Sequence, residues 1–129
     1  MTGSTASYDG EDAWLIKTDA QGEKVWERTL GGEDSDRAYS VQQISDGGYI
    51  VAGYTYSYGA GETDAWLIRT DAQGNKVWDR AFGGTYYDYA YSVQQTSDGG
   101  YIVAGNTRPC AAGTSNAWVI SVDAQGNKV

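Results

Sequence analysis

A block of sequence that recurs at a fixed spacing limits this chain to a repeat architecture. The stretch DAWLIKTDAQGEKVW begins at Asp12, returns as DAWLIRTDAQGNKVW at Asp64 and starts again as NAWVISVDAQGNKV at Asn116, so the copies begin 52 residues apart. Residues 12–63 and 64–115 are identical at about two-thirds of their positions, without a gap. Repeats with periods of roughly 40–50 residues are typical of solenoids, propellers and arrays.

Each repeat is expected to form four short β-strands. In one repeat these are residues 39–46, 48–55, 65–71 and 76–82, which are rich in β-branched and aromatic residues and bounded by Gly, Asp, Asn or Ser. None of them has the helical spacing of apolar residues. Segments 45–48 and 71–75 predict hairpin turns in which glycine adopts positive φ. This pattern predicts an all-β fold of four-stranded antiparallel β-propeller blades, with a plain β-sandwich as the alternative.

On this interpretation the chain holds about two and a half repeats. Residues 1–37 would form a partial blade with the end of the second strand and the third and fourth strands. Residues 38–89 would form a complete blade, and 90–129 a partial blade that lacks most of its fourth strand. Because propeller rings have four to eight blades and open stacks expose sheet faces, we expect homo-oligomerisation of two to four chains to give four, six or eight blades. A fragment of a longer array is the alternative.

Composition argues against several kinds of function. The formal net charge of −8 and the pI near 4.2 argue against a nucleic-acid partner, because phosphate binding needs clustered Lys and Arg. The chain has no histidine, which removes the commonest general base and the usual metal ligand. Its single cysteine, Cys110, is interpreted as a variable-loop residue. We therefore predict no enzyme activity, no cofactor and no metal site. No apolar run is long enough for membrane insertion.

The repeat resembles known propeller sequences. DAWLIRTDAQGNKVWDRAFGG and SVQQTSDGGYIVAG resemble the propeller repeats of secreted and surface-attached bacterial and archaeal proteins. The segment 68–84, with Asp71, Gly74, Lys76 and Trp78, is also similar to the tryptophan-docking repeat of quinoprotein-like propellers. The resemblance implies a secreted or cell-surface location, although the first residues, MTGSTASYDG, have no signal-peptide pattern. A fragment of a quinoprotein-type oxidoreductase is a lesser alternative, because the cofactor residues of that family are not identified in this sequence.

Residues that recur at the repeat period are assigned to the framework. The recurring tryptophans predict packing between blades, with ligand stacking as the alternative. They are Trp14, Trp26, Trp66, Trp78 and Trp118. Asp19, Asp71 and Asp123 are expected to cap hairpin turns, because the dense oxygen-ligand spacing of a calcium loop is absent. Asp36 and Asp88 are likewise expected to be structural turn or cap residues.

The repeats differ mainly in two segments, which form the candidate binding site. EDSDR at 33–37 is replaced by TYYDY at the equivalent positions 85–89 of the next repeat. YTYSYGAGET at 54–63 is likewise replaced by NTRPCAAGTS at 106–115. In an up-and-down sheet both segments lie at one end, opposite the invariant hairpins, and loops on a rigid scaffold commonly carry function. Their tyrosine and charged residues suit a carbohydrate or protein ligand. The alternatives are solvated loops with tyrosine packed over the sheet edge, and a purely structural repeat or an engineered or fragment propeller without ligand. The candidate ligand-binding residues are Asp34, Arg37, Tyr54, Tyr56, Tyr58, Tyr86, Tyr87, Tyr89 and Arg108.

Overall fold

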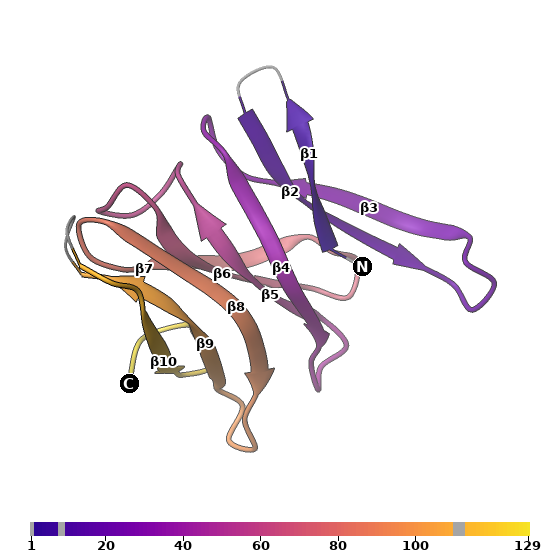
Figure 1. The fold of residues 1–129 in the computed structure, drawn as a ribbon. Helices are drawn as coiled ribbons and strands as arrows, with labels where there is room; N and C mark the ends of the chain where they lie inside the picture. The colour runs from indigo at the N-terminus through magenta and orange to yellow at the C-terminus, as the bar shows by residue number, and fades with distance from the viewer. Residues whose placement is uncertain (1, 8–9, 110–112) are drawn as a thin grey trace.

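The computed structural model describes residues 2–7, 10–109 and 113–129, with side chains from Glu11 onward (Figure 1). Cys110 lies outside these residues. Every regular element within them is a β-strand, which confirms the predicted all-β class. The strands form three antiparallel sheets, one four-stranded and two three-stranded, and no pairing between the described sheets closes them into a ring. In this part of the chain there is also no helix of the length and apolarity that a membrane span requires.

Each sheet is a meander in which consecutive strands pair. The first sheet contains β1 (Thr2–Ser7), β2 (Gly10–Thr18) and β3 (Lys24–Leu30). The middle sheet contains β4 (Asp36–Gln43), β5 (Tyr49–Thr55), β6 (Asp64–Thr70) and β7 (Lys76–Phe82). The third sheet contains β8 (Tyr87–Gln95), β9 (Tyr101–Arg108) and β10 (Asn116–Val122). The four strands predicted for one repeat correspond to β4 to β7, but β4 begins earlier than expected because Asp36 pairs with Thr55.

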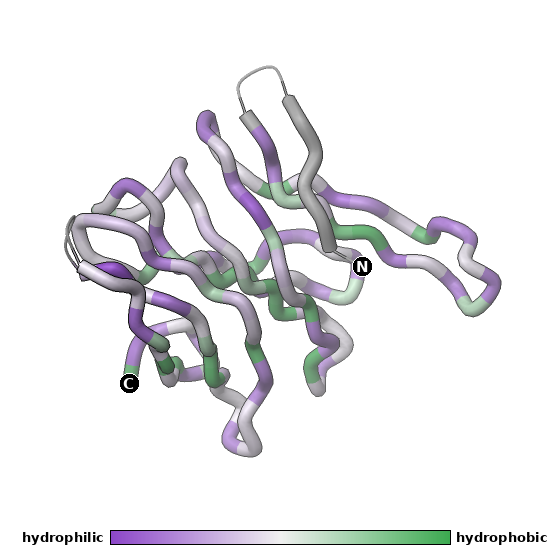
Figure 2. Tube along the Cα trace, in the orientation of Figure 1, coloured by the Kyte–Doolittle hydropathy of each residue, from purple (hydrophilic) through white to green (hydrophobic). Residues whose placement is uncertain are grey.

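Two apolar cores lie between the three sheets. The first, between the first and middle sheets, contains Ala13, Leu15, Ala38, Val51, Trp66 and Ile68. The second, between the middle and third sheets, contains Ile44, Ile50, Ala52, Ala65, Leu67, Ala90, Val93, Tyr101, Val103, Ile120 and Val122. Figure 2 shows apolar segments within the strands and a hydrophilic turn between β2 and β3. The middle sheet is buried on both faces, which explains the continuous apolar run Ala-Trp-Leu-Ile in β6.

The tryptophans of β2, β6 and β10 occupy one repeat position but differ in burial. Trp66 is 2% exposed in the first core, and its Nε1 donates a hydrogen bond to Asp79 at 3.0 Å. Trp118 is partly buried against the second core. Trp14 also donates to an acidic residue of the next strand, Glu27, at 3.2 Å, yet it is only half-buried. Trp14 therefore lies on a face of the first sheet that no described sheet covers.

Trp26 and Trp78 pack across the junctions between sheets. Trp26 on β3 lies edge-on to Tyr49 of the middle sheet, with ring centroids 5.7 Å apart. Trp78 on β7 lies edge-on to Tyr101 of the third sheet at 6.0 Å. Edge-to-face geometry at this distance is favourable between aromatic rings. The same aromatic pair thus links both pairs of neighbouring sheets.

Both indoles also cover the glycine of a hairpin turn in the next sheet. A Cβ atom on Gly74 would lie 2.6 Å from Trp26, and one on Gly126 would lie 2.8 Å from Trp78. The backbone φ angles of these glycines are 81° and 84°, in the left-handed region. The turn and the packed indole therefore both require glycine at these positions.

The hairpin turns are capped by aspartate, as predicted. Asp71 Oδ1 accepts hydrogen bonds from the backbone N–H groups of Gln73 and Asn75, both at 2.9 Å. Asp19 and Asp123 make the equivalent bonds in the other two sheets. The backbone donors stabilise the carboxylate form and lower the pKa of Asp71 and Asp123.

Candidate functional site

The loops that differ between the repeats meet at one end of the sheets. The chain crosses from the first sheet to the middle sheet at 31–35 and from the middle sheet to the third at 83–86, and we call these two segments the crossings. Segment 56–63, which follows β5, lies against both crossings. The Tyr58 hydroxyl donates to the Gly31 carbonyl at 3.0 Å, and the Glu62 N–H donates to the Thr85 carbonyl at 3.1 Å. The constant hairpins lie at the opposite end, where the β8–β9 hairpin forms the lowest point of Figure 1.

Five tyrosines form a continuous aromatic cluster beside this end. Tyr54 is its centre, and the rings of Tyr39, Tyr56 and Tyr89 lie 5.6, 5.8 and 5.1 Å from it. Tyr91 lies 5.2 Å from Tyr39 and stacks on Tyr89 at 6.0 Å. Tyr54 is only 8% exposed, and burial raises its pKa. Tyr54 therefore supports the cluster from below, whereas Tyr39, Tyr56 and Tyr91 present ring surface to solvent.

Tyr39 and Tyr91 were missed as candidate residues because they recur at the repeat period within strands. The register of β4 against β5 shifts between Ala38 and Ser40, and β8 shifts against β9 at the equivalent place. Such a bulge re-aims the extra side chain. The repeated Ala-Tyr-Ser triplet was visible in the sequence, but it carries no signal that a bulge occurs there.

A pocket of about 230 Å³ opens next to the cluster and is lined by Tyr87, Tyr89, Arg108 and Ser115. The guanidinium of Arg108 lies over the ring of Tyr87, 5.7 Å from its centroid. Arg108 Nε is buried, and it has no hydrogen-bond partner among the described residues. The Tyr87 hydroxyl bonds to the Glu62 carboxylate, which raises the pKa of Tyr87. The pocket thus combines a cationic donor, aromatic rings and a hydroxyl group. Ser115 was not among the predicted residues.

Arg37, unlike Arg108, has a carboxylate partner within the described residues. Its guanidinium forms an ion pair with Glu11, and Nε donates to the same carboxylate. The hydrogen bond from Arg37 to Glu11 raises the pKa of Arg37. In the next repeat, Tyr89 replaces Arg37 and Thr63 replaces Glu11. The two arginines among the predicted site residues therefore differ, because one has a carboxylate partner and the other does not.

The remaining predicted residues hold the loops together. The Tyr58 ring packs against Trp66, with centroids 5.7 Å apart. The Asp34 N–H donates to Ser57 Oγ at 3.0 Å, and the half-buried Tyr86 accepts a backbone hydrogen bond from the preceding loop. These contacts connect the crossing segments to the loop after β5. Tyr56 remains exposed, and it lies close enough to Tyr87 and Tyr89 for its charge to contribute to the raised pKa of both.

Buried aspartates lie beneath the loops. Asp64 and Asp88 are each 1% exposed. Asp88 Oδ2 accepts a hydrogen bond from the Gly84 N–H at 2.8 Å, and Asp64 Oδ2 accepts one from the Gly61 N–H at 3.2 Å. Asp64 Oδ1 has no partner among the described residues. Burial, together with the charge of Asp88, raises the pKa of Asp64.

Asp36 occupies the Asp88 position one repeat earlier and is fully bonded. It accepts hydrogen bonds from the Gly32 N–H at 2.8 Å and from the Ser57 hydroxyl at 2.7 Å, and it also bonds to Thr55. Asp36 and Asp88 are therefore structural caps of the crossings, as the sequence indicated. Within the described residues, no group of three or more His, Cys, Asp or Glu side chains is placed to hold a metal ion.

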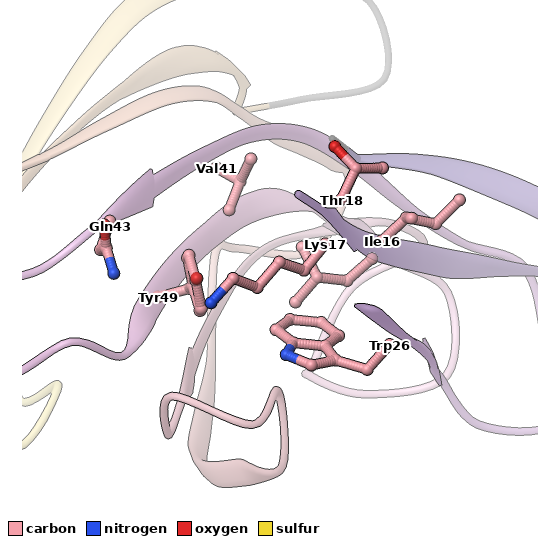
Figure 3. A pocket seen from close by; sticks show the side chains of 8 residues that line it. Ile16, Lys17, Thr18, Trp26, Val41, Gln43 and Tyr49 are labelled. Carbon is pink, nitrogen blue, oxygen red and sulfur yellow. The ribbon is translucent and has the colours of Figure 1, made fainter. Parts of the chain in front are cut away.

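A second hollow of about 260 Å³ opens between the first and middle sheets at the hairpin end (Figure 3). It is lined by Leu15, Ile16, Lys17, Thr18, Trp26, Val41, Gln43 and Tyr49. Figure 3 shows the Lys17 side chain reaching toward Tyr49 above the Trp26 ring. The next repeat has the same residue at every one of these positions except Lys17, where it has Arg69. This hollow is therefore part of the framework, unlike the pocket at Arg108.

The chain is similar in part to a known protein. No protein-family model matches the chain. The chain is 30% identical over 125 residues to the regulatory protein FlaEY of Caulobacter vibrioides. The match covers 83% of this chain but 13% of that protein, so the chain spans a small part of the length of its relative.

Proposed function

We propose that this chain is a non-enzymatic β-propeller module that assembles with other copies of itself and binds a ligand at the loop end of its sheets. Three features support the proposal: the repeated meander, the two cores built from equivalent residues, and the tyrosine and arginine side chains at one end. The name of its relative, a regulatory protein, agrees with a role other than catalysis.

The packing of the sheets supports the propeller interpretation. Residues at equivalent repeat positions take equivalent places in the two cores. Ala13 and Leu15 of β2 face the middle sheet, and their counterparts Ala65 and Leu67 of β6 face the third sheet. On the opposite face of β6, Trp66 and Ile68 face the first sheet, and their counterparts Trp118 and Ile120 of β10 face the middle sheet. The first strands of the middle and third sheets, β4 and β8, lie side by side, with Tyr39 against Tyr91 (Figure 1). Repetition of one interface between successive units is the basis of such architectures.

The main support for assembly is an exposed apolar face on the third sheet. The equivalent face of the middle sheet is covered by the third sheet. Leu67 is 1% exposed, whereas its counterpart Val119 is 65% exposed. Ile50 is 0% exposed, whereas its counterpart Ile102 is 37% exposed. In the middle sheet the covering surface is another sheet of the same repeat sequence. The third sheet of one copy therefore suits the first sheet of another copy.

The first sheet carries the complementary face. Trp14 and Ile16 are half-buried, while their counterparts Trp66 and Ile68 are 2% and 1% exposed in the first core. A contact between the first sheet of one copy and the third sheet of the next is head-to-tail, and such contacts close into rings when the rotation permits. Light scattering after size exclusion tests this proposal. We expect a mass of two to four chains of 13.9 kDa, and a stable monomer would contradict it.

The loop end provides the ligand surface in this proposal. Aromatic rings next to a guanidinium group are common in sugar and protein recognition sites. We further propose a secreted or cell-surface location, in keeping with the resemblance of the repeats. A glycan and protein array tests the binding role. The double change Tyr87→Ala and Tyr89→Ala is expected to abolish binding, while Val25→Ala, at an exposed framework position, is expected to leave it intact.

A further inference from the structure

The pocket at Arg108 contains a cationic donor that lacks an anionic partner. No ion pair among the described residues includes Arg108, and its buried Nε makes no hydrogen bond within them. A buried donor without an acceptor is unfavourable, and a charged acceptor satisfies a guanidinium best. The pocket that Arg108 lines therefore offers a place where an anionic group of a ligand would be stabilised.

The preceding repeat supplies an internal comparison. There, the chain provides its own counterion, because Arg37 pairs with Glu11. In the next repeat Thr63 replaces Glu11, and the arginine stands at position 108 on the neighbouring strand β9. Thr63 is 0% exposed, and its Oγ1 has no partner in the described structure. Arg108 occupies the repeat position of Tyr56 rather than that of Arg37, and the position of the carboxylate that pairs with Arg37 holds a threonine.

The nearby acidic side chains are already engaged. Glu62 accepts the hydrogen bond of the Tyr87 hydroxyl. Asp88 is buried and accepts the Gly84 N–H. Because Asp88 is adjacent to Tyr87 and to Tyr89 in β8, its side chain lies on the other face of the strand from both. Arg108 therefore remains the charged group of the pocket that is available to a ligand.

We infer that this pocket recognises a carboxylate-bearing sugar unit, such as a uronic acid residue of an oligosaccharide. This inference rests on the ligand-binding role proposed above. The guanidinium fork matches a planar carboxylate with two parallel hydrogen bonds. The rings of Tyr87 and Tyr89 offer apolar surface to the sugar ring, and Ser115 offers a hydroxyl to its polar groups. A volume of about 230 Å³ suits one sugar unit rather than a larger ligand.

Calorimetric titration with oligogalacturonate and with a neutral galactose oligomer of the same length tests the inference. We expect the acidic oligomer to bind the whole protein at least tenfold more tightly than the neutral one, on the order of one good charged hydrogen bond. Arg108→Gln should remove this preference. Arg108→Lys keeps the charge without the planar fork, and it should retain part of the preference. Lys24→Gln removes one positive charge at an exposed position and should leave the preference unchanged.

Two outcomes would overturn the inference. Equal affinity for acidic and neutral oligomers, unchanged in Arg108→Gln, would leave the proposed binding role in place but remove the anionic specificity. Absence of binding to both oligomers would also overturn the inferred recognition of an acidic sugar. The glycan and protein array would then decide whether the loop end binds a ligand at all. Tryptophan fluorescence and the oligomeric mass of each variant separate loss of recognition from loss of structure.

Discussion

The carboxylates of Asp64 and Asp88 converge on Gly83. A Cβ atom at this glycine would lie 2.5 Å from Asp64 Oδ1 and 2.4 Å from Asp88 Oδ2. The chain therefore crosses between the middle and third sheets over two buried carboxyl groups. Burial raises the pKa of Asp64, and the negative charge of Asp88 on the same glycine raises it further.

We expect Asp64→Asn to stabilise the protein at neutral pH. The pKa of Asp64 is higher in the folded chain than in the unfolded one. The contribution of Asp64 to the free energy of unfolding is therefore fully present below the unfolded pKa, and it is lost as the pH rises through the folded pKa. Asparagine has no charge to bury, and this part of the pH dependence should disappear. Urea unfolding at acidic and neutral pH measures the effect.

Asp36→Asn is the matched control for this experiment. Asp36 is 0% exposed, and its carboxylate accepts hydrogen bonds from Gly32, Ser57 and Thr55. An amide cannot accept all of these bonds, so we expect a loss of about 1–3 kcal/mol in the free energy of unfolding. Equal effects of the two substitutions would mean that the difference in bonding between Asp36 and Asp64 has no energetic consequence.

The contribution of the docked indole can be isolated by comparing two glycines. Gly22 and Gly74 stand at the same turn position, with φ of 84° and 81°, but an added Cβ meets nothing within 4 Å at Gly22 and Trp26 at 2.6 Å at Gly74. Gly22→Ala should destabilise only through backbone strain, by about 1–2 kcal/mol. Gly74→Ala should cost a further 1–3 kcal/mol or so, because Trp26 must move. Urea unfolding of both variants checks the difference, which should be absent if Trp26 does not dock there.

Capping of the hairpin turns should contribute to stability against acid. The backbone N–H of Asn75 is the main cause of the lowered pKa of Asp71. A lowered folded pKa gives stability that is present above the unfolded pKa and is lost as the pH falls through the folded one. Asp71→Ala should therefore lower the melting temperature at neutral pH and reduce its acid dependence. Glu33→Ala, at an exposed carboxylate in a crossing, should change neither quantity.

The proposed assembly makes a prediction about Val119. Val119→Glu would place a charge in the head-to-tail interface, and we expect association to weaken at least about tenfold because an unpaired buried charge is strongly unfavourable. The matched control is Val77→Glu. Val77 is 51% exposed even in the middle sheet, which has a neighbour on each face, so it lies outside the repeated interface. Sedimentation velocity at several concentrations compares the two variants, and dissociation of both would argue against the assigned faces.

The strands and turns could be predicted because the signals that specify them are local. The β-branched and aromatic residues of β5 and β6 and the Asp-Ala-Gln-Gly turns are local features of the sequence, and they occur in more than one repeat. The start of β4 was misplaced because Asp36 joins the strand through its pairing with Thr55, nineteen positions away. A long-range partner of this kind leaves no mark in the sequence around Asp36.

The candidate site was less accessible to sequence reasoning because its chemistry depends on contacts between repeats. Tyr54 belongs to a residue type that is common in binding surfaces, yet its position on β5 places it beneath the rings of Tyr39 and Tyr89. Arg37 and Arg108 look alike in sequence, and only the location of Glu11 distinguishes them. The tyrosine-rich character of the loops was visible from composition, but the division of those tyrosines into supporting and exposed rings required the fold.

The covering of the middle sheet on both faces has a consequence for how the chain unfolds. Since each sheet contacts only its neighbours, local stability should decrease from the middle sheet toward the two outer ones. Amide hydrogens of β5 and β6 should then exchange with solvent most slowly, and those of β1 and β10 most quickly. Closing the ring would remove this gradient, because every sheet would have two neighbours and the assembly would open as one cooperative unit.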